Sequence, residues 1–509
     1  MCIAQQGAFS RRLGKTHSVL RGVPGRSFDD SDEAAGLGSR AAFGIASSIV
    51  VTGIRTLIQI GTLAILARQL THNDFGVFGL TIIVVGLVAI IAQMGIPPAL
   101  VYYERIDERD LAAASAACIG LGILAWLAIS FTAPVAAWLL REDALSAVLP
   151  VAGSLVAIDA TAHVARSCLQ RDLRFETVAV IDLVTYACAY SLVAIWLAHE
   201  GAGVWSLVLA TLSLAFARSA VFNMVGGLIW PRFDVKRTRK LLKYGKAEAV
   251  ARLGNFFAVQ GDNFVIGRFL GAAALGVYGR AYGVVSVPAS VIGQVVQDVL
   301  FPTFSRAYDR QSQQFYRASI GAVLLGVLPV GVAVAIVAPE IVLVVLGPDW
   351  ADVVPPLRVL ALVMVFRVGY KVSDALAQAT GTMAGRARRQ FVYAAAVVGA
   401  ACAGLPWGLV GSATGVAFAI VVNYLLMMQL VRRIVQISWR ELVRIHVVAL
   451  PPTVITAVAL GVVVVLMRSG HMGPWLTIMA TCLISAIVVC SSFAVLSPFG
   501  LGHLPQSGD

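Results

Sequence analysis

Charged side chains recur inside stretches of the chain that are otherwise apolar. A charge at the middle of a bilayer costs roughly 2.5–3.5 kcal/mol on insertion scales, so each must face protein or water. Three sets of polar residues step by three or four and therefore share one helical face each. Arginine offers a planar fork for phosphate or carboxylate oxygens, so these faces predict a hydrated cavity for an anionic ligand. The sets are Ser48, Thr52, Arg55, Gln59 and Thr62; Glu248, Arg252, Asn255, Val259 and Asp262; and Arg367, Lys371, Asp374 and Gln378.

The candidate residues divide by charge into two roles. The cations and one amide suit substrate binding, while the carboxylates could bind a coupling proton or sodium ion. Asp159 and Asp182 are weaker candidates of the same kind, and Asp298 is a further acidic residue near an apolar span. We assign substrate binding to Arg55, Arg252, Asn255, Arg280, Arg367 and Lys371, and ion coupling to Glu248, Asp262 and Asp374.

Simpler explanations exist for several of these residues. Asp262 and Arg268 could lie close enough to the outer interface to be solvated. Lys371 and Asp374 could pair across one helical turn in a structural role. Arg280 could extend outward to the interface.

Composition requires a membrane environment for these residues. Of the 509 residues, 59% are hydrophobic and 13% are charged, whereas a soluble domain has about 25% charged residues. The apolar runs are continuous rather than alternating, which favours transmembrane helices over a barrel. We therefore expect an all-α polytopic protein with about 14 spans. They lie near 42–66, 77–98, 111–134, 145–167, 176–198, 203–227, 247–267, 275–300, 318–340, 354–378, 390–408, 412–431, 446–467 and 474–496.

The basic loops alternate with sparsely charged ones, which sets the orientation. With the N-terminus inside, the inner segments hold most arginines and lysines, among them the run WPRFDVKRTRKLLKYGK, whereas the outer loops hold Arg68, Arg141, Arg268 and Arg468. This bias predicts that both termini are cytoplasmic. It also explains the net charge of +12 without a nucleic-acid partner. The polar start has no apolar signal-peptide core, and the first 40 residues read as a disordered tail.

A pattern repeats after 200 residues. Residues 67–79 read ARQLTHNDFGVFG, and residues 267–279 read GRFLGAAALGVYG. The first two polar sets correspond at the same offset, so the chain is expected to hold two six-helix bundles related by a pseudo-twofold axis along the membrane normal. Two further helices follow. The expected parts are 1–40 as tail, 41–230 and 247–436 as the two bundles, 231–246 as a basic linker, 437–496 as two additional helices, and 497–509 as a cytoplasmic tail.

No pattern for enzymatic, cofactor or metal chemistry is present. The chain lacks GxxxxGK[ST], HExxH and Gly-x-Ser-x-Gly, and its seven cysteines form neither a CxxC pair nor a Cys/His cluster. The loops are mostly too short to carry a catalytic acid. A transporter without cofactor or metal is therefore expected.

Residues 262–306 resemble the polysaccharide transporter family of lipid-linked oligosaccharide flippases, in particular its exopolysaccharide and colanic-acid-like branch. The resemblance extends over about residues 40–435. It implies membership of the superfamily that includes drug/cation antiporters and the lipid II flippase, with two bundles that open alternately. It is carried by Asp262, Gly267, Arg268, Leu270, Gly271, Leu275, Gly276, Tyr278, Pro288, Phe301, Pro302, Phe304 and Ser305.

The resemblance and the arginines together predict a flippase for surface-polysaccharide synthesis. The expected substrate is an undecaprenyl-diphosphate-linked oligosaccharide, moved across the bacterial inner membrane through a cationic cavity, with H⁺ or Na⁺ as coupling ion. A polysaccharide polymerase or export complex is a possible partner. The alternatives are an ion-coupled multidrug or small-molecule antiporter, whose cavity should be acidic, and a non-transporting membrane scaffold.

Overall fold

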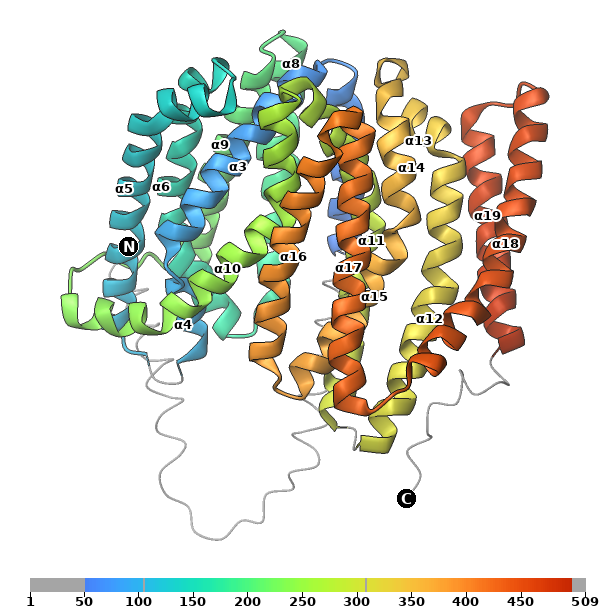
Figure 1. The fold of residues 1–509 in the computed structure, drawn as a ribbon. Helices are drawn as coiled ribbons and strands as arrows, with labels where there is room; N and C mark the ends of the chain where they lie inside the picture. The colour runs from blue at the N-terminus through green and yellow to red at the C-terminus, as the bar shows by residue number, and fades with distance from the viewer. Residues whose placement is uncertain (1–50, 104–105, 307–308, 497–509) are drawn as a thin grey trace. The chain divides into compact units, whose positions relative to one another are not determined.

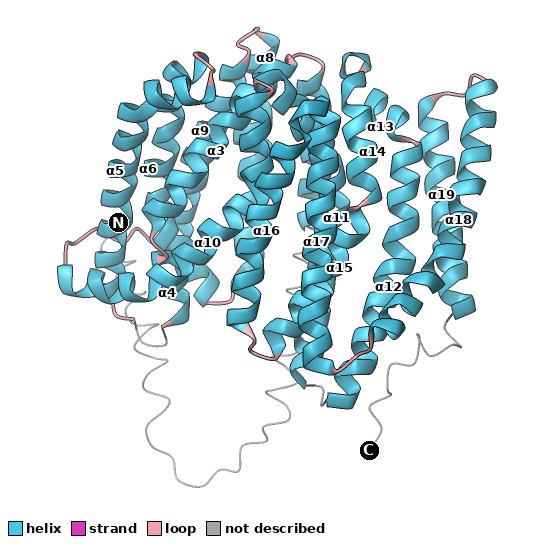
Figure 2. Ribbon diagram, viewed as in Figure 1, coloured by secondary structure: helices cyan, strands magenta, loops and turns pink. Residues whose placement is uncertain are grey.

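The computed structural model describes residues 51–103, 106–306 and 309–496. The predicted tails and the start of the first expected span lie outside this part. Every regular element in the described part is helical (Figures 1 and 2). After a first helix over Val51–Ala67, the helices are α3 (His72–Gln93), α4 (Ile96–Tyr102), α5 (Glu108–Leu140), α6 (Ala144–Arg171), α7 (Phe175–Thr185), the π-helix η1 (Tyr186–Ser191), α8 (Leu192–His199), α9 (Val204–Gly226), α10 (Val235–Phe269), α11 (Ala272–Arg306), α12 (Asp309–Ile336), α13 (Ala338–Val345), the 3-10 helix η2 (Pro348–Val353), α14 (Val354–Leu362), α15 (Met364–Ala379), α16 (Met383–Gly404), the 3-10 helix η3 (Leu405–Trp407), α17 (Gly408–Val435), α18 (Trp439–Ser469) and α19 (Pro474–Leu496).

Ten helical stretches of the described residues are long and apolar enough to cross a membrane, which confirms the all-α polytopic class. The count of 14 stays a prediction, and the difference has identifiable causes. The stretch 385–435 holds two expected spans in succession. The expected span 354–378 is divided between α14 and α15, and α10 carries too many polar residues to qualify on composition alone.

Small residues bring the two repeats into direct contact at the upper end of Figure 1. A Cβ on Gly76 of α3 would overlap the carbonyl oxygen of Ala272, and one on Gly276 of α11 would overlap that of His72. Positions 72 and 76 thus meet 276 and 272, so the contact is reciprocal between positions that the 200-residue offset relates. Both glycines belong to the repeated pattern, so the repeat makes its own contact here.

The two copies begin these helices with different chemistry. Thr71 caps α3 through a capping box, in which its hydroxyl accepts from the Asp74 backbone N–H and the Asp74 carboxylate accepts from the Thr71 backbone N–H. The equivalent residue before α11 is Gly271, with φ +92, a conformation that favours glycine. The same turn is therefore achieved by a side-chain cap in one copy and by backbone freedom in the other.

A tryptophan from the second half reinforces this contact. Trp350 in η2 is 1% exposed, and its indole N–H donates to the carbonyl oxygen of Ala67 at 2.8 Å. The centre of its ring lies 4.2 Å from the centre of the His72 ring. Arg68 donates from Nη2 to the carbonyl oxygen of Val344 at 2.7 Å. The first loop of the N-terminal half is therefore held by the segment that contains α13 and η2.

The last two helices are attached to the second half at both ends of α18. Near one end Arg468 donates from Nε and Nη2 to the Glu340 carboxylate at 2.7 and 3.0 Å. Near the other end Arg317 of α12 lies 2.8 Å from a carboxylate oxygen of Glu441. Helix α18 also packs along α12 between these points. These contacts connect the additional helices to the second half.

We expect Gly276→Ala to lower the melting temperature of the purified protein, because the new methyl group would overlap the His72 carbonyl oxygen. Overpacking of this kind costs about 1–3 kcal/mol. The matched control is Gly279→Ala on the same helix, where a Cβ meets no atom within 4 Å. Both changes replace glycine by alanine inside a helix and gain the same intrinsic helix preference. The difference between the two melting temperatures therefore reports the overlap alone. Equal melting temperatures for the two variants would contradict the close contact.

Candidate functional site

Two predicted substrate-binding arginines meet a pair of stacked tyrosines. The Arg55 guanidinium lies 5.8 Å from the centre of the Tyr186 ring, and Tyr186 stacks on Tyr190 at 4.8 Å. Arg280 lies over Phe75 at 4.4 Å and is close enough to both tyrosines for electrostatic interaction. We call Arg55, Arg280, Phe75, Tyr186 and Tyr190 the arginine–tyrosine cluster. It joins the first described helix, α3, η1 and α11.

The arginines of this cluster have no acidic partner among the described residues. The Nε atoms of Arg55 and Arg280 are closed off from solvent and lack a hydrogen-bond acceptor. Other arginines in the described spans, such as Arg386 and Arg166, do form ion pairs. A guanidinium without a counter-charge in an apolar region is costly, so this arrangement favours an anionic ligand.

The tyrosine pair lies in a local departure from α-helical geometry. Residues Tyr186 to Ser191 form a π-helix, an irregularity that is frequent at functional sites. The hydroxyl of Ser191 donates to the Tyr186 carbonyl oxygen at 3.2 Å and accepts from Thr62 at 2.9 Å. Thr62 and Arg55 lie on the same helix, so this hydrogen bond fixes the tyrosine pair beside the arginine.

A second cluster lies within the C-terminal half. Asp262 is 2% exposed, and its carboxylate accepts from the Tyr278 hydroxyl at 2.7 Å and from the Asn263 backbone N–H at 2.8 Å. Arg367 lies over the Tyr282 ring at 4.3 Å and near enough to Asp262 to interact electrostatically. Asp262 is therefore enclosed by protein, and the alternative of a solvated carboxylate at the outer interface was wrong.

Asp374 takes its ion-pair partner from a different helix. Both Asp374 carboxylate oxygens are contacted by Arg386 of α16, from Nε and, at 2.9 Å, from Nη2. Gln378 donates to the same carboxylate at 2.8 Å. The Lys371 side chain instead lies against Gly293 of α11. The expected one-turn pair of Lys371 and Asp374 is therefore replaced by an α15–α16 ion pair.

The remaining predicted residues lie along α10. Arg252 donates to the side-chain oxygen of Gln93 on α3 at 3.4 Å, so it joins the two halves. Asn255 is exposed and accepts from Gln390 of α16 at 3.3 Å. The side chain of Glu248 lies outside the described part of the chain. The predicted residues are thus distributed over several neighbourhoods, and their common cavity remains a prediction.

Sequence reasoning undervalued one charged group. Asp182 of α7 lies 3.1 Å from Arg166 Nη2 and 3.3 Å from Arg218 Nε. Asp159 is close enough to both arginines for electrostatic interaction. Arg218 was not among the predicted site residues, although it is also a charged residue inside an apolar span, as they are. The tyrosines were missed as well, although Tyr186 and Tyr190 have the spacing of one helical face.

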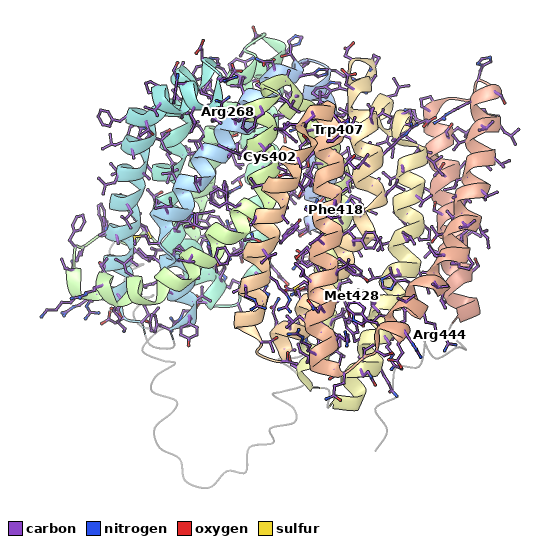
Figure 3. The ribbon with its side chains drawn as sticks, in the orientation of Figure 1. Arg268, Cys402, Trp407, Phe418, Met428 and Arg444 are labelled. Carbon is purple, nitrogen blue, oxygen red and sulfur yellow. The ribbon has the colours of Figure 1, made fainter. Side chains whose placement is uncertain are left out.

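A hollow of about 830 Å³ lies away from all of these charges. It is an open apolar groove between α16 and α17, lined by small residues and by Trp407 and Phe418, which Figure 3 labels on the C-terminal half. Close backbone contact between Gly404 and Gly411 explains why the helix pair is narrow there. No predicted site residue lines this groove.

Two solved structures share the fold. The lipid II flippase MurJ in an inward closed conformation aligns with a TM-score of 0.72 at 12% identity, covering 89% of this chain and 99% of that one. An inward-facing multidrug resistance MATE family transporter of the MOP superfamily aligns with a TM-score of 0.61 at 18% identity, covering 76% and 98%. Likeness at such low identity concerns the fold alone.

Curated relatives are similar in sequence over a large part of the chain. The teichuronic acid biosynthesis protein TuaB of Bacillus subtilis is 25% identical over 318 residues, 62% of this chain and 66% of that protein. The succinoglycan biosynthesis transport protein ExoT of Rhizobium meliloti is 31% identical over 316 residues, 59% and 61% respectively. The lipopolysaccharide biosynthesis protein WzxC of Escherichia coli is 21% identical over 345 residues, 66% and 69%. The matched part spans just under two thirds of the first two relatives.

Of these relatives, ExoT is named a transport protein, and TuaB and WzxC are named biosynthesis proteins. A family model described as polysaccharide biosynthesis protein matches residues 65–355, more than half of the chain. The match includes both copies of the glycine-rich repeat and most of the arginine–tyrosine cluster. The chain belongs to this polysaccharide biosynthesis protein family.

Proposed function

We propose that the protein is a flippase that moves an undecaprenyl-diphosphate-linked oligosaccharide across the bacterial inner membrane for surface-polysaccharide synthesis. The diphosphate and sugars would cross between the two halves while the polyprenyl chain stays in the bilayer. Both termini would be cytoplasmic, as the distribution of basic residues indicates. A polysaccharide polymerase or export complex would receive the product.

The absence of an acidic partner for Arg55 and Arg280 among the described residues carries the proposal. A diphosphate supplies the negative charge that these guanidinium groups lack, and planar guanidinium forks match its oxygens. The neighbouring Tyr186 and Tyr190 add hydroxyl groups and ring faces, which suit sugars as well as phosphates. By contrast, Arg386 already holds Asp374 and is less available to a ligand.

The position of the cluster supports a route through the contact between the repeats. Arg280 lies one turn along α11 from Gly276, and Phe75 precedes Gly76 on α3. The cluster is therefore adjacent to the glycine contact. Release of a bound headgroup on the outer side would require this contact and the Trp350–Ala67 hydrogen bond to separate. An anion moving outward would also gain about 2.3 kcal/mol per charge from a 100 mV inside-negative potential.

For ion coupling, the contacts favour Asp262 over Asp374. Asp374 is engaged by Arg386, whereas the Asp262 hydrogen bonds come from neutral donors, a hydroxyl and a backbone N–H. A proton or sodium ion could therefore exchange at Asp262 without breaking an ion pair. Arg252, Asn255, Arg367 and Lys371 keep their predicted role in substrate binding, and Glu248 keeps its predicted role in ion coupling.

An ion-coupled small-molecule antiporter is the competing function, since a multidrug transporter shares the fold. A cation exporter would need acidic residues exposed to its cargo. The arginine–tyrosine cluster offers the opposite charge. Accumulation of lipid-linked oligosaccharide in a deletion strain with unchanged drug sensitivity would decide in favour of the flippase.

We expect Arg55→Gln and Arg280→Gln each to reduce flipping at least tenfold, because hydrogen bonds to charged groups contribute about 1.5–3 kcal/mol each. Reconstituted protein with undecaprenyl-diphosphate-linked sugar and a leaflet-exposure assay would measure the rate. Arg55→Lys and Arg280→Lys should retain part of the activity, because the charge remains but the fork is lost.

The control for these variants is Arg174→Gln, which removes an exposed arginine outside the cluster. It should flip at the rate of the unchanged protein. Wild-type rates for both Arg55→Gln and Arg280→Gln would rule out the cluster as the headgroup site.

A second prediction concerns coupling. Asp262→Asn cannot exchange a proton or neutralise a sodium ion, so we expect flipping to lose its dependence on an imposed H⁺ or Na⁺ gradient. The exposed Asp298→Asn on α11 is the matched control and should keep that dependence. Gradient dependence that persists in Asp262→Asn would assign coupling to another carboxylate.

A further inference from the structure

The segment that follows α9, together with the first turns of α10, combines exposed aromatic residues with exposed cations. We call residues 228–242 the basic arm. Trp230 is 70% exposed, Phe233 88% and Val235 82%, values far above those of side chains packed in the protein. Arg232, Lys236 and Arg239 lie between and beyond them and are also exposed. Such a mixture of rings and cations on one short segment is typical of membrane-interface anchors.

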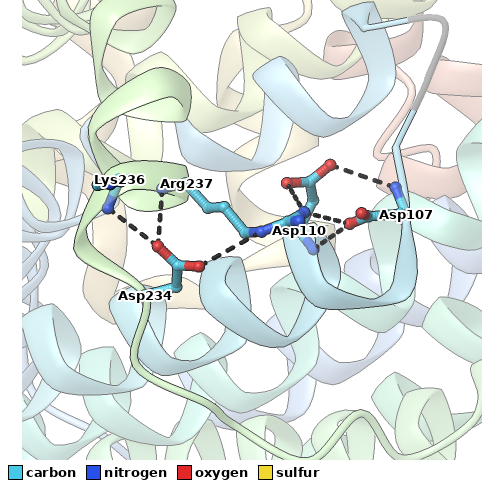
Figure 4. A network of polar contacts seen from close by, with 5 residues as sticks. All are labelled: Asp107, Asp110, Asp234, Lys236 and Arg237. Carbon is cyan, nitrogen blue, oxygen red and sulfur yellow. Dashed lines mark hydrogen bonds and ion pairs between the residues drawn. The ribbon is translucent and has the colours of Figure 1, made fainter.

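One arginine of the arm is used differently from the rest. Arg237 points to α5 and lies between three carboxylates: Nη1 is 2.5 Å from Asp107 and 2.7 Å from Asp110, and Nε is 3.3 Å from Asp234 (Figure 4). Asp234 also caps α10 by accepting from the backbone N–H groups of Lys236 and Arg237. The acidic groups of this junction are therefore directed to Arg237, and Arg232, Lys236 and Arg239 have no ion-pair partner among the described residues.

Backbone and core contacts hold the arm in place. The Arg232 backbone N–H donates to the Ala112 carbonyl oxygen of α5 at 3.1 Å. The Ser115 hydroxyl of α5 donates to the Ile229 carbonyl oxygen of the arm at 3.3 Å. Leu241 is 2% exposed and packs in a small core with Ile96 and other apolar residues of α4 to α6. The exposed side chains thus extend from a fixed scaffold rather than from a free loop.

The Asp107 carboxylate of this junction is ionised at ordinary pH. The hydrogen bond from Arg237 lowers the pKa of Asp107 to about 2, with help from the Asp110 backbone N–H. A depressed carboxyl pKa stabilises the fold above the unfolded value near 4 and loses that effect as the pH falls toward 2. The ion pair of Asp107 with Arg237 is therefore present through the physiological range.

We propose that the basic arm binds anionic phospholipid at the membrane surface on its side of the bilayer. Trp230, Phe233 and Val235 would enter the interfacial layer, and Arg232, Lys236 and Arg239 would contact lipid phosphates. Figure 1 supports this placement, because the first turns of α10 run across the lower ends of the N-terminal helices before the helix rises along them. By the proposed orientation this surface is the cytoplasmic leaflet, which carries the anionic lipids.

The charge pattern favours lipid over a protein or nucleic-acid partner. Cations alone would suit any polyanion, but exposed rings interleaved with them suit a surface whose phosphates overlie hydrocarbon. The arm also directly follows an apolar span, α9, so the bilayer interface is within reach without any further partner. Because the arm joins the two halves in sequence, bound lipid would hold the start of α10 against the membrane.

The test measures lipid binding rather than transport, so it is independent of the proposed flippase activity. Purified full-length protein in neutral detergent is titrated with phosphatidylglycerol, with phosphatidylcholine as the uncharged comparison, and the melting temperature is followed. Each juxtamembrane cation changes such binding roughly fivefold. We expect Arg232→Gln/Lys236→Gln/Arg239→Gln to raise the half-saturating phosphatidylglycerol concentration at least tenfold. The effect in the unchanged protein should also weaken with salt.

The matched control is Arg433→Gln/Arg440→Gln/Arg444→Gln, which removes three exposed arginines at the end of α17 and the start of α18 and has the same net charge as the arm variant. It should respond to phosphatidylglycerol like the unchanged protein. Trp230→Ala/Phe233→Ala should weaken the response but leave its salt dependence. An equal shift in both charge variants, or a response without salt dependence, would overturn the proposal. If the triple arm variant melts lower without lipid, the three single glutamine variants replace it and must each shift the midpoint.

Discussion

A guanidinium group among apolar helices needs a counter-charge, and this requirement organises the membrane part of the molecule. Asp374 supplies one for Arg386, and Asp182 lies between Arg166 and Arg218. These pairs join neighbouring helices: Arg386 connects α16 to α15, and Arg166 and Arg218 connect α6 and α9 to α7. The cluster of Arg55 and Arg280 has aromatic rings but no carboxylate among the described residues. The ion pairs therefore stabilise the bundle, and we propose the cluster as the place where a ligand completes the charge balance.

The same distinction appears at the basic arm. Arg237 is neutralised by aspartates and holds the arm to α5, while its neighbours remain available. In both regions, an acidic partner identifies a structural arginine, and an arginine without one is a candidate for binding. The two regions differ in solvent access. Water screens the arm, so several cations must act together there, whereas fewer are needed in the low-dielectric cluster.

Sequence patterns predicted the helical class correctly, because helical period and hydropathy are local properties. Gly76 and Gly276, which the 200-residue offset relates, lie where α3 and α11 meet, and the twofold relation of the two halves stays a prediction. It was harder to predict from the sequence which charged and polar side chains contact one another. Lys371 is one turn from Asp374, yet the ion pair uses Arg386, because the turn between α15 and α16 returns that side chain to the carboxylate. The contact between Arg252 and Gln93 spans 159 residues and depends on packing that no local pattern records.

The hydrogen bond from Trp350 to the Ala67 carbonyl has a consequence for how the two halves could part. Both groups are buried from bulk solvent by their mutual contact, so separation leaves an orphan donor and an orphan acceptor. Water must reach the indole N–H and the carbonyl oxygen as the two halves move apart. Otherwise the free-energy barrier to separation rises by the full desolvation penalty of both groups. Water would therefore enter first beside the charged side chain of Arg68, at the edge of the contact between the two halves. The close glycine contact of α3 and α11 would be the last part to separate.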